Sequence, residues 1–216
     1  MTQSHDDTRR VRIAFDGRLP QARWGPLFHV FRIEQPEVEL EWRSAEFPAI
    51  GRPQLDGADV GLFLEPVADP TMSILALDTS PMVVILSAGD PLAHRHEIDV
   101  SDILDRPFPG APRVDPDWLA FWTLDGLRGG RPPERTGDEV TDAEGALQVI
   151  ASGRAIGTLP ARVADGLAHP GVISLPLRGA PQARTCLVWR SGDDRPAVRA
   201  LVELASAWTR VGRDTR

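Results

Sequence analysis

The chain has 216 residues, of which 42% are hydrophobic and 25% are charged, as in an average globular protein, so neither disorder nor a fibrous structure is expected. No apolar run approaches the ~20 residues of a membrane helix, and the polar start lacks the apolar core of a signal peptide. A cytoplasmic protein without a membrane partner is therefore expected, in line with its single cysteine, Cys186. A net charge of −7 with scattered basic residues argues against a nucleic-acid-binding face.

The first part of the chain alternates strand and helix patterns. Apolar alternation or apolar runs predict strands, and periodic apolar residues bounded by prolines predict helices. The expected elements are a strand at 11–15, a helix at 21–35, a strand at 38–42, a short helix at 48–55 and a strand at 59–64. This order is the sequence form of a parallel sheet.

The central stretch from Pro81 to Leu86 is an unbroken apolar run, closed by Gly89, Asp90 and Pro91. It is too short for a helix and rich in β-branched residues, which predicts a strand buried on both faces.

The second half contains further units of helix and strand. Asp115 and Pro116 have the types expected at the N-cap and first position of a helix, and Thr141 with Glu144 has the spacing of a capping box. The remaining expectations are a short helix or turn at 98–104, a connection at 107–116, a charged loop at 126–133, strands at 155–160, 172–177 and 185–189, and a helix at 196–208.

Several motifs in this order resemble the effector-binding domain of LysR-type transcriptional regulators, from about Val11 to Trp208. The resemblance rests on "EQPEVELEW", "LDGADVGLF", "VVILSAGDPLA", "VIASGRAIGTLPA" and "CLVWR". Each motif is weak alone, whereas their order and spacing are specific. Ala155 replaces the second glycine of the family's G-x-G turn, which disturbs little because only a positive φ would require glycine there.

The resemblance implies an α/β fold of two Rossmann-like lobes, as in type 2 periplasmic binding proteins, with a ligand cleft between them. Lobe I is expected at 11–86 plus 185–212, lobe II at 87–184, and residues 1–10 form a polar tail. The resemblance also implies a homodimer. Because such regulators carry a winged helix-turn-helix before this domain, the chain is either a stand-alone module or a fragment, and direct DNA binding is not expected.

Candidate ligand-binding residues follow position by position from the resemblance. They are Asp16, Gly17, Arg18, Glu46, Phe47, Leu64 and Glu65 from lobe I, Ser87 at the hinge, and Trp118 and Thr141 from lobe II. Arg18 is the strongest candidate for an oxyanion partner because its guanidinium binds carboxylates or phosphates bidentately. A salt bridge to Asp16, or simple solvation, remains an equal alternative for Arg18. For Trp118, a place in the pocket and a place in the core are equally open.

Other chemistry is less favoured. His94 and His96 lack a third metal ligand nearby, Cys186 lies in an apolar strand, and no cofactor motif is present, so neither metal nor cofactor is expected. The leading interpretation is a non-enzymatic module that binds a small-molecule effector. One alternative is a lyase or dehydratase on the same fold, using Asp16, Glu46 or Glu65 as acid or base. Another is protein interaction without a ligand.

Overall fold

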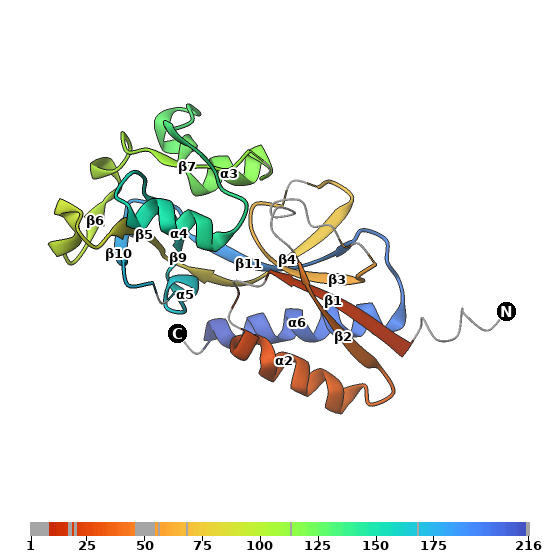
Figure 1. The fold of residues 1–216 in the computed structure, drawn as a ribbon. Coiled ribbons are helices and arrows are strands. Elements are labelled where there is room, and N and C mark those ends of the chain that lie inside the picture. The colour runs from red at the N-terminus through yellow and green to blue at the C-terminus, as the bar shows by residue number, and fades with distance from the viewer. Residues whose placement is uncertain are drawn as a thin grey trace. The chain divides into compact units, whose positions relative to one another are not determined.

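The structure is a computed structural model that describes residues 9–16, 19, 21–45, 55, 57–67, 69–112, 114–167 and 169–214. These residues form two compact units (Figure 1). Unit 1 contains the described residues up to 45, those between 55 and 79, and those from 184 onward. Unit 2 contains the described residues between 80 and 183.

Unit 1 is built on a mixed sheet with the strand order β2-β1-β3-β11-β4. Its elements are β1 (Arg10–Asp16), α2 (Gln21–Glu34), β2 (Glu39–Ala45), β3 (Val60–Leu64), β4 (Met72–Ser80), β11 (Ala183–Arg190) and α6 (Pro196–Asp214). Strand β1 pairs in parallel with both β2 and β3, whereas β3 and β11 are antiparallel. The predicted parallel arrangement of the first three strands is confirmed.

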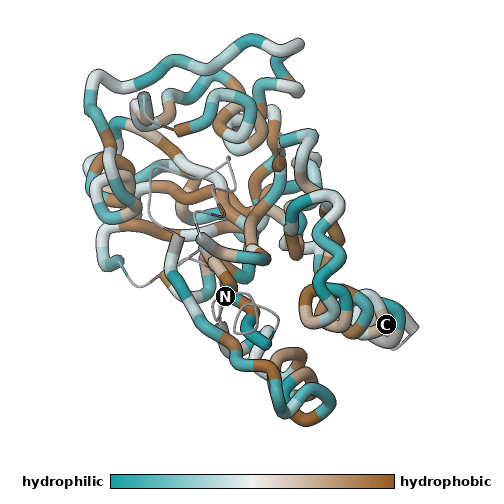
Figure 2. Tube along the Cα trace, turned by 90° about the vertical axis from the view of Figure 1, so that its right-hand side faces the viewer, coloured by the Kyte–Doolittle hydropathy of each residue, from teal (hydrophilic) through white to brown (hydrophobic). Residues whose placement is uncertain are grey.

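Helix α2 covers one face of this sheet with an apolar side. Trp24, Leu27, Phe28 and Phe31 recur at the spacing of one helix face, and all four are buried. The helix ends two residues before Pro36, which cannot continue it. Helix α6 packs beside α2 and is amphipathic, with hydrophobic and hydrophilic residues alternating along its turns in Figure 2.

The other face of the sheet has its own apolar cluster, which comprises Ala14, Leu55, Ala58, Phe63, Cys186 and Val188. Gly61 has a packing role here, because a Cβ at this position would lie 2.0 Å from the Phe63 ring. All five residues of β3 are buried, as expected for a central strand covered on both faces.

Unit 2 contains a four-stranded sheet of order β6-β10-β5-β9 and a two-stranded sheet of β7 and β8. Its strands are β5 (Met82–Ser87), β6 (Ile98–Asp99), β7 (Phe108–Gly110), β8 (Arg135–Glu139), β9 (Gly157–Pro160) and β10 (Val172–Arg178). Its helices are α3 (Pro116–Trp122), α4 (Ala143–Ala151) and α5 (Ala161–Ala164), with 3₁₀ turns η2 (Pro91–His94), η3 (Val100–Asp102) and η4 (Asp125–Arg128).

The central run forms β5, and five of its six residues are buried, which confirms the predicted strand. However, β5 pairs with β9 and β10 of unit 2 and has no ladder to the sheet of unit 1. The expected lobe boundary at residue 86 is therefore too late, because the units divide between residues 79 and 80. Periodicity identifies a buried strand but not the sheet that it joins.

Four strands were missed by the sequence patterns. Strand β4 precedes the central run, β6 begins the segment expected as a helix or turn at 98–104, β7 lies in the proline-rich connection, and β8 follows the charged loop. Strand β8 is mostly polar and only partly buried, so it lacks the alternation on which prediction depends. The helix expected at 48–55 falls, apart from Leu55, outside the described residues. None of the helices in the described part of the chain combines the length and hydrophobicity needed to cross a membrane.

Candidate functional site

The strands that lead into three of the candidate segments end at one edge of the sheet of unit 1. Asp16 pairs with Ala45 across β1 and β2, and Phe15 pairs with Leu62 across β1 and β3. Because all three strands are parallel, their carboxyl ends lie side by side, and the chain leaves each strand at this edge. The topology therefore brings together the ends of the strands that lead into 16–18, 46–47 and 64–65.

Four of these candidate residues are not among those that the structure describes. Gly17, Arg18, Glu46 and Phe47 lie outside the described residues, and Asp16 is placed only as the last residue of β1. Whether Arg18 binds a ligand or pairs with Asp16 is therefore not tested, and both alternatives stay predictions.

Glu65 follows β3 and already has partners. Its backbone N–H donates to the Arg184 carbonyl at 3.0 Å, and its carboxylate forms an ion pair with the Arg184 guanidinium. The neighbouring Cys186 thiol has a raised pKa, first because it is buried and then because the Glu65 carboxylate lies close to it. Cys186 is therefore a protonated core thiol, as expected. Leu64, at the end of β3, is buried and paired with Thr185.

Ser87 lies at the end of β5, within unit 2. Its hydroxyl donates to the Ala151 carbonyl at 3.0 Å and accepts the Gly89 N–H at 3.4 Å. The hydroxyl therefore fastens the end of the strand to the last turn of α4. The units divide before β5 begins, so Ser87 lies inside unit 2, and its role in binding a ligand stays a prediction.

The start of α4 differs by one residue from the predicted capping box. Asp142 is the N-cap, and its carboxylate accepts the Gly145 N–H at 2.7 Å. Thr141 is exposed and precedes the cap. Both residue types are good N-caps, so the sequence allowed either, and an aspartate also stabilises the positive end of the helix dipole.

Ser87 and Thr141 lie at opposite ends of α4. Ser87 bonds to Ala151 at the carboxyl end of this nine-residue helix, whereas Thr141 precedes its amino end. A nine-residue helix is ~13 Å long at a rise of ~1.5 Å per residue. One small ligand cannot contact both residues, so the two candidates do not belong to a single site.

Trp118 begins the buried side of α3. Asp115 caps this helix as predicted, with its carboxylate accepting the N–H groups of Asp117 and Trp118 at 3.0 and 3.2 Å. The Trp118 indole is buried and lies 5.3 Å from the ring of Trp122. This position agrees with the interpretation of the aromatic residues of α3 as core.

Comparison with known proteins identifies the family. The model of the LysR substrate binding domain matches residues 4–210. The chain belongs to this family.

Solved structures of LysR regulators share its fold. The effector binding domain of a BenM variant matches with a TM-score of 0.70 and 18% identity, over 94% of this chain and 96% of that one. The LysR family regulator CbnR gives a TM-score of 0.69 and 17% identity over 95% and 72%, and reduced OxyR gives 0.68 and 18% over 93% and 94%. These LysR effector-binding domains have the two-lobe, periplasmic-binding-protein-like fold, and the predicted fold class is confirmed.

A curated relative is the Hca operon transcriptional activator HcaR of Escherichia coli (strain K12). It is 24% identical over 180 residues, which cover 81% of this chain and 60% of HcaR. The chain thus spans about 60% of the length of this regulator.

Within the LysR substrate-binding fold, sequence reasoning missed Arg184. This side chain neutralises Glu65 because β3 and β11 are antiparallel neighbours, although the two residues are far apart in sequence. In the sequence, the opposite charges of Glu65 and Arg184 were the only indication of this ion pair. No group of three potential metal ligands occurs in the described part of the chain, where His94 and His96 are both exposed.

Proposed function

We propose that this chain is a non-enzymatic regulatory module that binds a small-molecule effector. The observation that carries the proposal is the shared edge of β1, β2 and β3, from which the segments 16–18, 46–47 and 64–65 continue. Carboxyl ends of parallel strands are where open α/β folds bind their ligands, since the loops there project free backbone groups. Membership of the LysR substrate-binding family supports the same conclusion.

On this proposal, the candidate contacts of the effector are Asp16, Gly17, Arg18, Glu46, Phe47, Leu64 and Thr141. Glu65 serves by fixing Arg184 rather than by offering a free carboxylate, because the two side chains are paired. Arg18 is the proposed partner of an anionic effector, because its five N–H donors match an oxyanion.

A thermal-shift screen followed by calorimetry tests this function. Benzoate is the first probe, because a BenM effector binding domain of the same fold has benzoate as its effector, and succinate and inorganic phosphate complete the set. For an anion that binds, Arg18→Ala should weaken the affinity by about 1.5–3 kcal/mol, or roughly ten- to a hundred-fold, without lowering the melting temperature. Arg199→Ala, on an exposed side of α6, is the control and should change neither quantity.

Two outcomes would contradict the proposed role of Arg18. Unchanged affinity of Arg18→Ala for a bound anion would remove it from the site. A lower melting temperature with unchanged affinity would instead support the alternative in which Arg18 pairs with Asp16.

The enzyme alternative has less support. A lyase would need a free acid or base among Asp16, Glu46 and Glu65. Of these, only the Glu65 side chain is described, and it is engaged by Arg184. The relatives that match are transcriptional regulators.

We also propose that the chain is a cytoplasmic homodimer without direct sequence-specific binding to DNA. Closed two-fold assemblies are the commonest oligomers, and the net charge of −7 disfavours contact with phosphates. Light scattering at micromolar concentration should give the dimer mass, and a gel shift with duplex DNA should show no sequence-selective complex. A monomer in the first experiment, or a selective shift in the second, would contradict this.

A further inference from the structure

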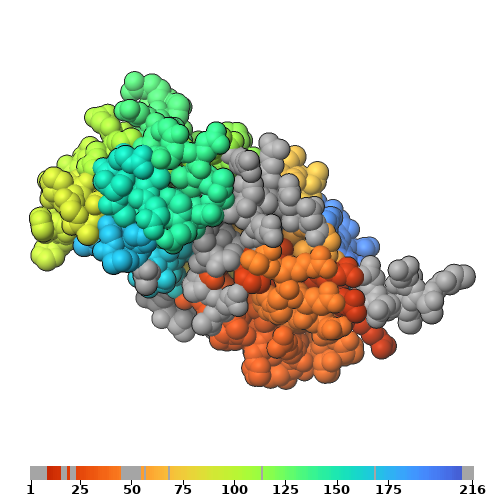
Figure 3. Space-filling model, viewed as in Figure 1, coloured from red at the N-terminus to blue at the C-terminus, as the bar shows by residue number. Residues whose placement is uncertain are grey.

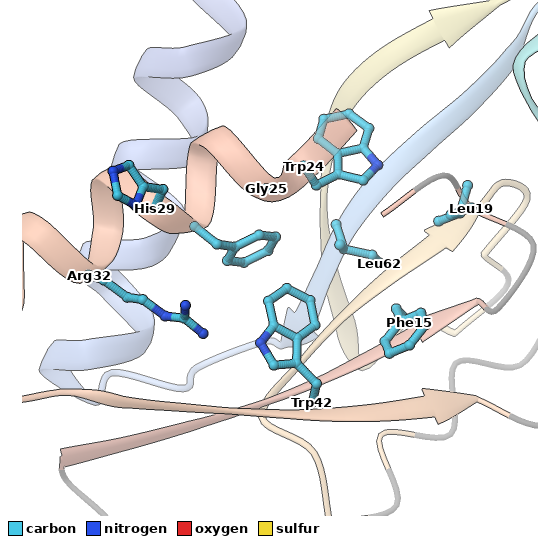
Figure 4. A pocket seen from close by; sticks show the side chains of 9 residues that line it. Phe15, Leu19, Trp24, Gly25, His29, Arg32, Trp42 and Leu62 are labelled. Carbon is cyan, nitrogen blue, oxygen red and sulfur yellow. The ribbon is translucent and has the colours of Figure 1, made fainter. Parts of the chain in front are cut away.

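Arginines stand beside aromatic rings in both units, but they differ in burial. In unit 1, Arg32 borders a pocket of about 280 Å³ between α2 and the sheet (Figure 4). The Phe28 and Trp42 rings of this pocket already touch, with centroids 4.6 Å apart, and Arg32 is exposed, so water solvates its charge. In unit 2, the Arg128 guanidinium lies 5.7 Å from the Phe108 ring, and its side chain is only 8% exposed. A guanidinium buried in this way needs its partners inside the protein.

Two guanidinium groups of unit 2 meet at Thr123. Arg128 donates from Nη1 to the Thr123 carbonyl and from Nε to the Leu104 carbonyl at 2.5 Å. Arg135 donates from Nη2 to the Thr123 hydroxyl at 3.2 Å. This part of the chain is drawn in green in Figure 3. Because both acceptor atoms belong to one buried residue, the two positive groups are held next to each other.

One terminal nitrogen of each guanidinium is left over. Nη2 of Arg128 and Nη1 of Arg135 are buried and have no hydrogen-bond partner among the described residues. The indole Nε1–H of Trp122, the residue before Thr123, is a further buried donor without a partner there. Buried donors are nearly always paired, and a guanidinium offers donors only. The two arginine nitrogens therefore require an acceptor.

The buried positive charge also exceeds the negative charge around it. In the described part of the chain, the ion-pair partner of this group is Asp125, whose carboxylate lies 3.9 Å from Arg128 Nη1 and accepts the Thr123 hydroxyl at 2.6 Å. Asp105 attracts Arg128 as well, but Asp105 is exposed and water screens its charge. Burial lowers the pKa of Arg135, Asp125 opposes this shift, and the neighbouring Arg128 adds to it. Since arginine stays protonated in proteins, two buried cations share one buried carboxylate.

We propose that Arg128 and Arg135 form a buried site for a small monovalent anion of the halide class. The ion accepts hydrogen bonds from Arg128 Nη2 and Arg135 Nη1 and supplies the missing negative charge. The cost of taking an ion out of water rises with the square of its charge and falls with its radius, so chloride or bromide suits an enclosed site better than sulfate or fluoride.

The loop around η4 gives the ion a path to the arginines. Gly126, Gly129 and Gly130 are exposed, and a Cβ at any of them would meet no atom within 4 Å. Local opening of so loosely packed a loop admits a small ion without unfolding unit 2. Once bound, the ion joins β8, which carries Arg135, to the turns that Arg128 holds. The site shares no residue with the proposed effector site, so the two proposals are independent.

Thermal unfolding of the whole chain in chloride tests the site. Sodium chloride replaces sodium gluconate at constant ionic strength, because gluconate is too large for an enclosed site. For a dissociation constant of about 1 mM, the melting temperature should rise by about 5 °C between about 1 and 100 mM chloride. Sodium bromide should have the same effect.

Variants locate the ion. Arg135→Met keeps the length of the side chain without its charge, and the chloride-dependent rise should fall below about 1 °C, whatever the melting temperature of the variant in gluconate. Arg131→Met, an exposed arginine of the same loop, is the matched control and should keep the full rise. Arg18→Ala should keep it as well, which separates this site from that of the effector.

NMR spectroscopy of the unmodified chain locates the ion without any substitution. In a ¹H–¹⁵N spectrum, the Nε–H resonances of Arg128 and Arg135, assigned through their side-chain carbons, should shift as chloride is added, and that of Arg131 should not. This measurement decides the question if Arg135→Met fails to fold.

Four results would overturn the proposal. Equal melting temperatures of the unmodified chain in chloride and gluconate would show that water satisfies the buried donors. An equal chloride-dependent rise in Arg135→Met would exclude this arginine as a contact. Loss of the rise in Arg18→Ala would place the ion in the effector site and leave the effector proposal standing. A rise without any shift of the Arg128 and Arg135 resonances would place the ion elsewhere.

Discussion

The two units hold their partly buried arginines in different ways. In unit 1, Arg195 lies before α6 and bonds to two carboxylates, those of Asp193 at 2.6 and 3.0 Å and of Asp59 at 2.7 Å. Asp59 in turn accepts the Arg12 N–H at 2.7 Å, which ties the group to β1. The pKa of Arg195 is raised, first by its bonds to Asp193.

In unit 2, Arg128 and Arg135 depend mostly on neutral acceptors. The Arg128 side chain is 8% exposed and donates to the carbonyls of Leu104 and Thr123, and its guanidinium lies 5.7 Å from the Phe108 ring. Arg135 donates to the Thr123 hydroxyl at 3.2 Å. One terminal nitrogen of each arginine has no hydrogen-bond partner among the described residues, and burial lowers the pKa of both.

This contrast separates two uses of the same residue. Arg195 joins charges of opposite sign, and its contribution should depend on pH. Arg128 mainly crosslinks backbone carbonyls of two turns, with the Asp125 carboxylate at 3.9 Å, so its contribution should depend less on the ionisation of an acid than that of Arg195. The following three variants test this difference.

The largest effect is expected for Arg128→Ala. The substitution leaves two backbone carbonyls without their donor and opens a cavity beside Phe108. We expect the free energy of unfolding to fall by about 3 kcal/mol or more. Urea unfolding followed by circular dichroism measures it. Arg131→Ala is the control, because Arg131 is exposed and makes one long hydrogen bond to the Arg128 carbonyl. A loss of unfolding free energy below about 1 kcal/mol in Arg128→Ala would contradict the proposed crosslink.

A smaller, pH-dependent effect is expected for Asp193→Asn. Hydrogen bonds from Arg195 lower the pKa of Asp193 below its ordinary value, so its contribution is complete above about pH 4 and is lost as the pH falls through the lowered pKa. At pH 7 the variant should lose about 1–2 kcal/mol of unfolding free energy.

Urea unfolding of the Asp193→Asn variant between pH 7 and pH 2 measures this linkage. The difference from the unmodified chain should shrink as the pH falls below about 4, because the native carboxylate then becomes protonated. The exposed neighbour Asp194→Asn should behave like the unmodified chain throughout. A pH-independent loss would mean that Asp193 acts through shape rather than charge.

The smallest effect is expected at the start of α4. Asp142→Ala removes a cap whose carboxylate accepts the Gly145 N–H and bonds to no arginine among the described residues, so the loss should be about 1 kcal/mol. Thr141→Ala should be nearly neutral, because Thr141 is exposed and lies outside the cap. Thermal unfolding of the two variants measures how much stability each one loses. Equal losses would contradict the assignment of Asp142, rather than Thr141, as the cap. The loss of unfolding free energy in Asp142→Ala can then be compared with that in Asp193→Asn. The comparison indicates how much an arginine partner adds to the contribution of an aspartate.

Much of the local structure follows from the sequence alone. The apolar run at 81–86, the four aromatic and aliphatic residues of α2 and the Asp115 cap of α3 correspond to the structure, because burial and capping act within a few residues. The order of the motifs also led to the correct family, and hence to the two-lobe fold.

Tertiary structure decided the contacts between distant segments. The sequence could not assign β5 to the sheet of unit 2, because the apolar residues of a strand buried on both faces do not indicate which strands it pairs with. It could not separate Ser87 from Thr141, which α4 holds at its two ends, nor pair Glu65 with Arg184. It predicted the charged loop at 126–133, most of which is exposed, but not that the Arg128 side chain is buried there against backbone carbonyls of remote turns. Local patterns record propensity and periodicity, but pairing and hydrogen bonding between remote residues are fixed only when the chain folds.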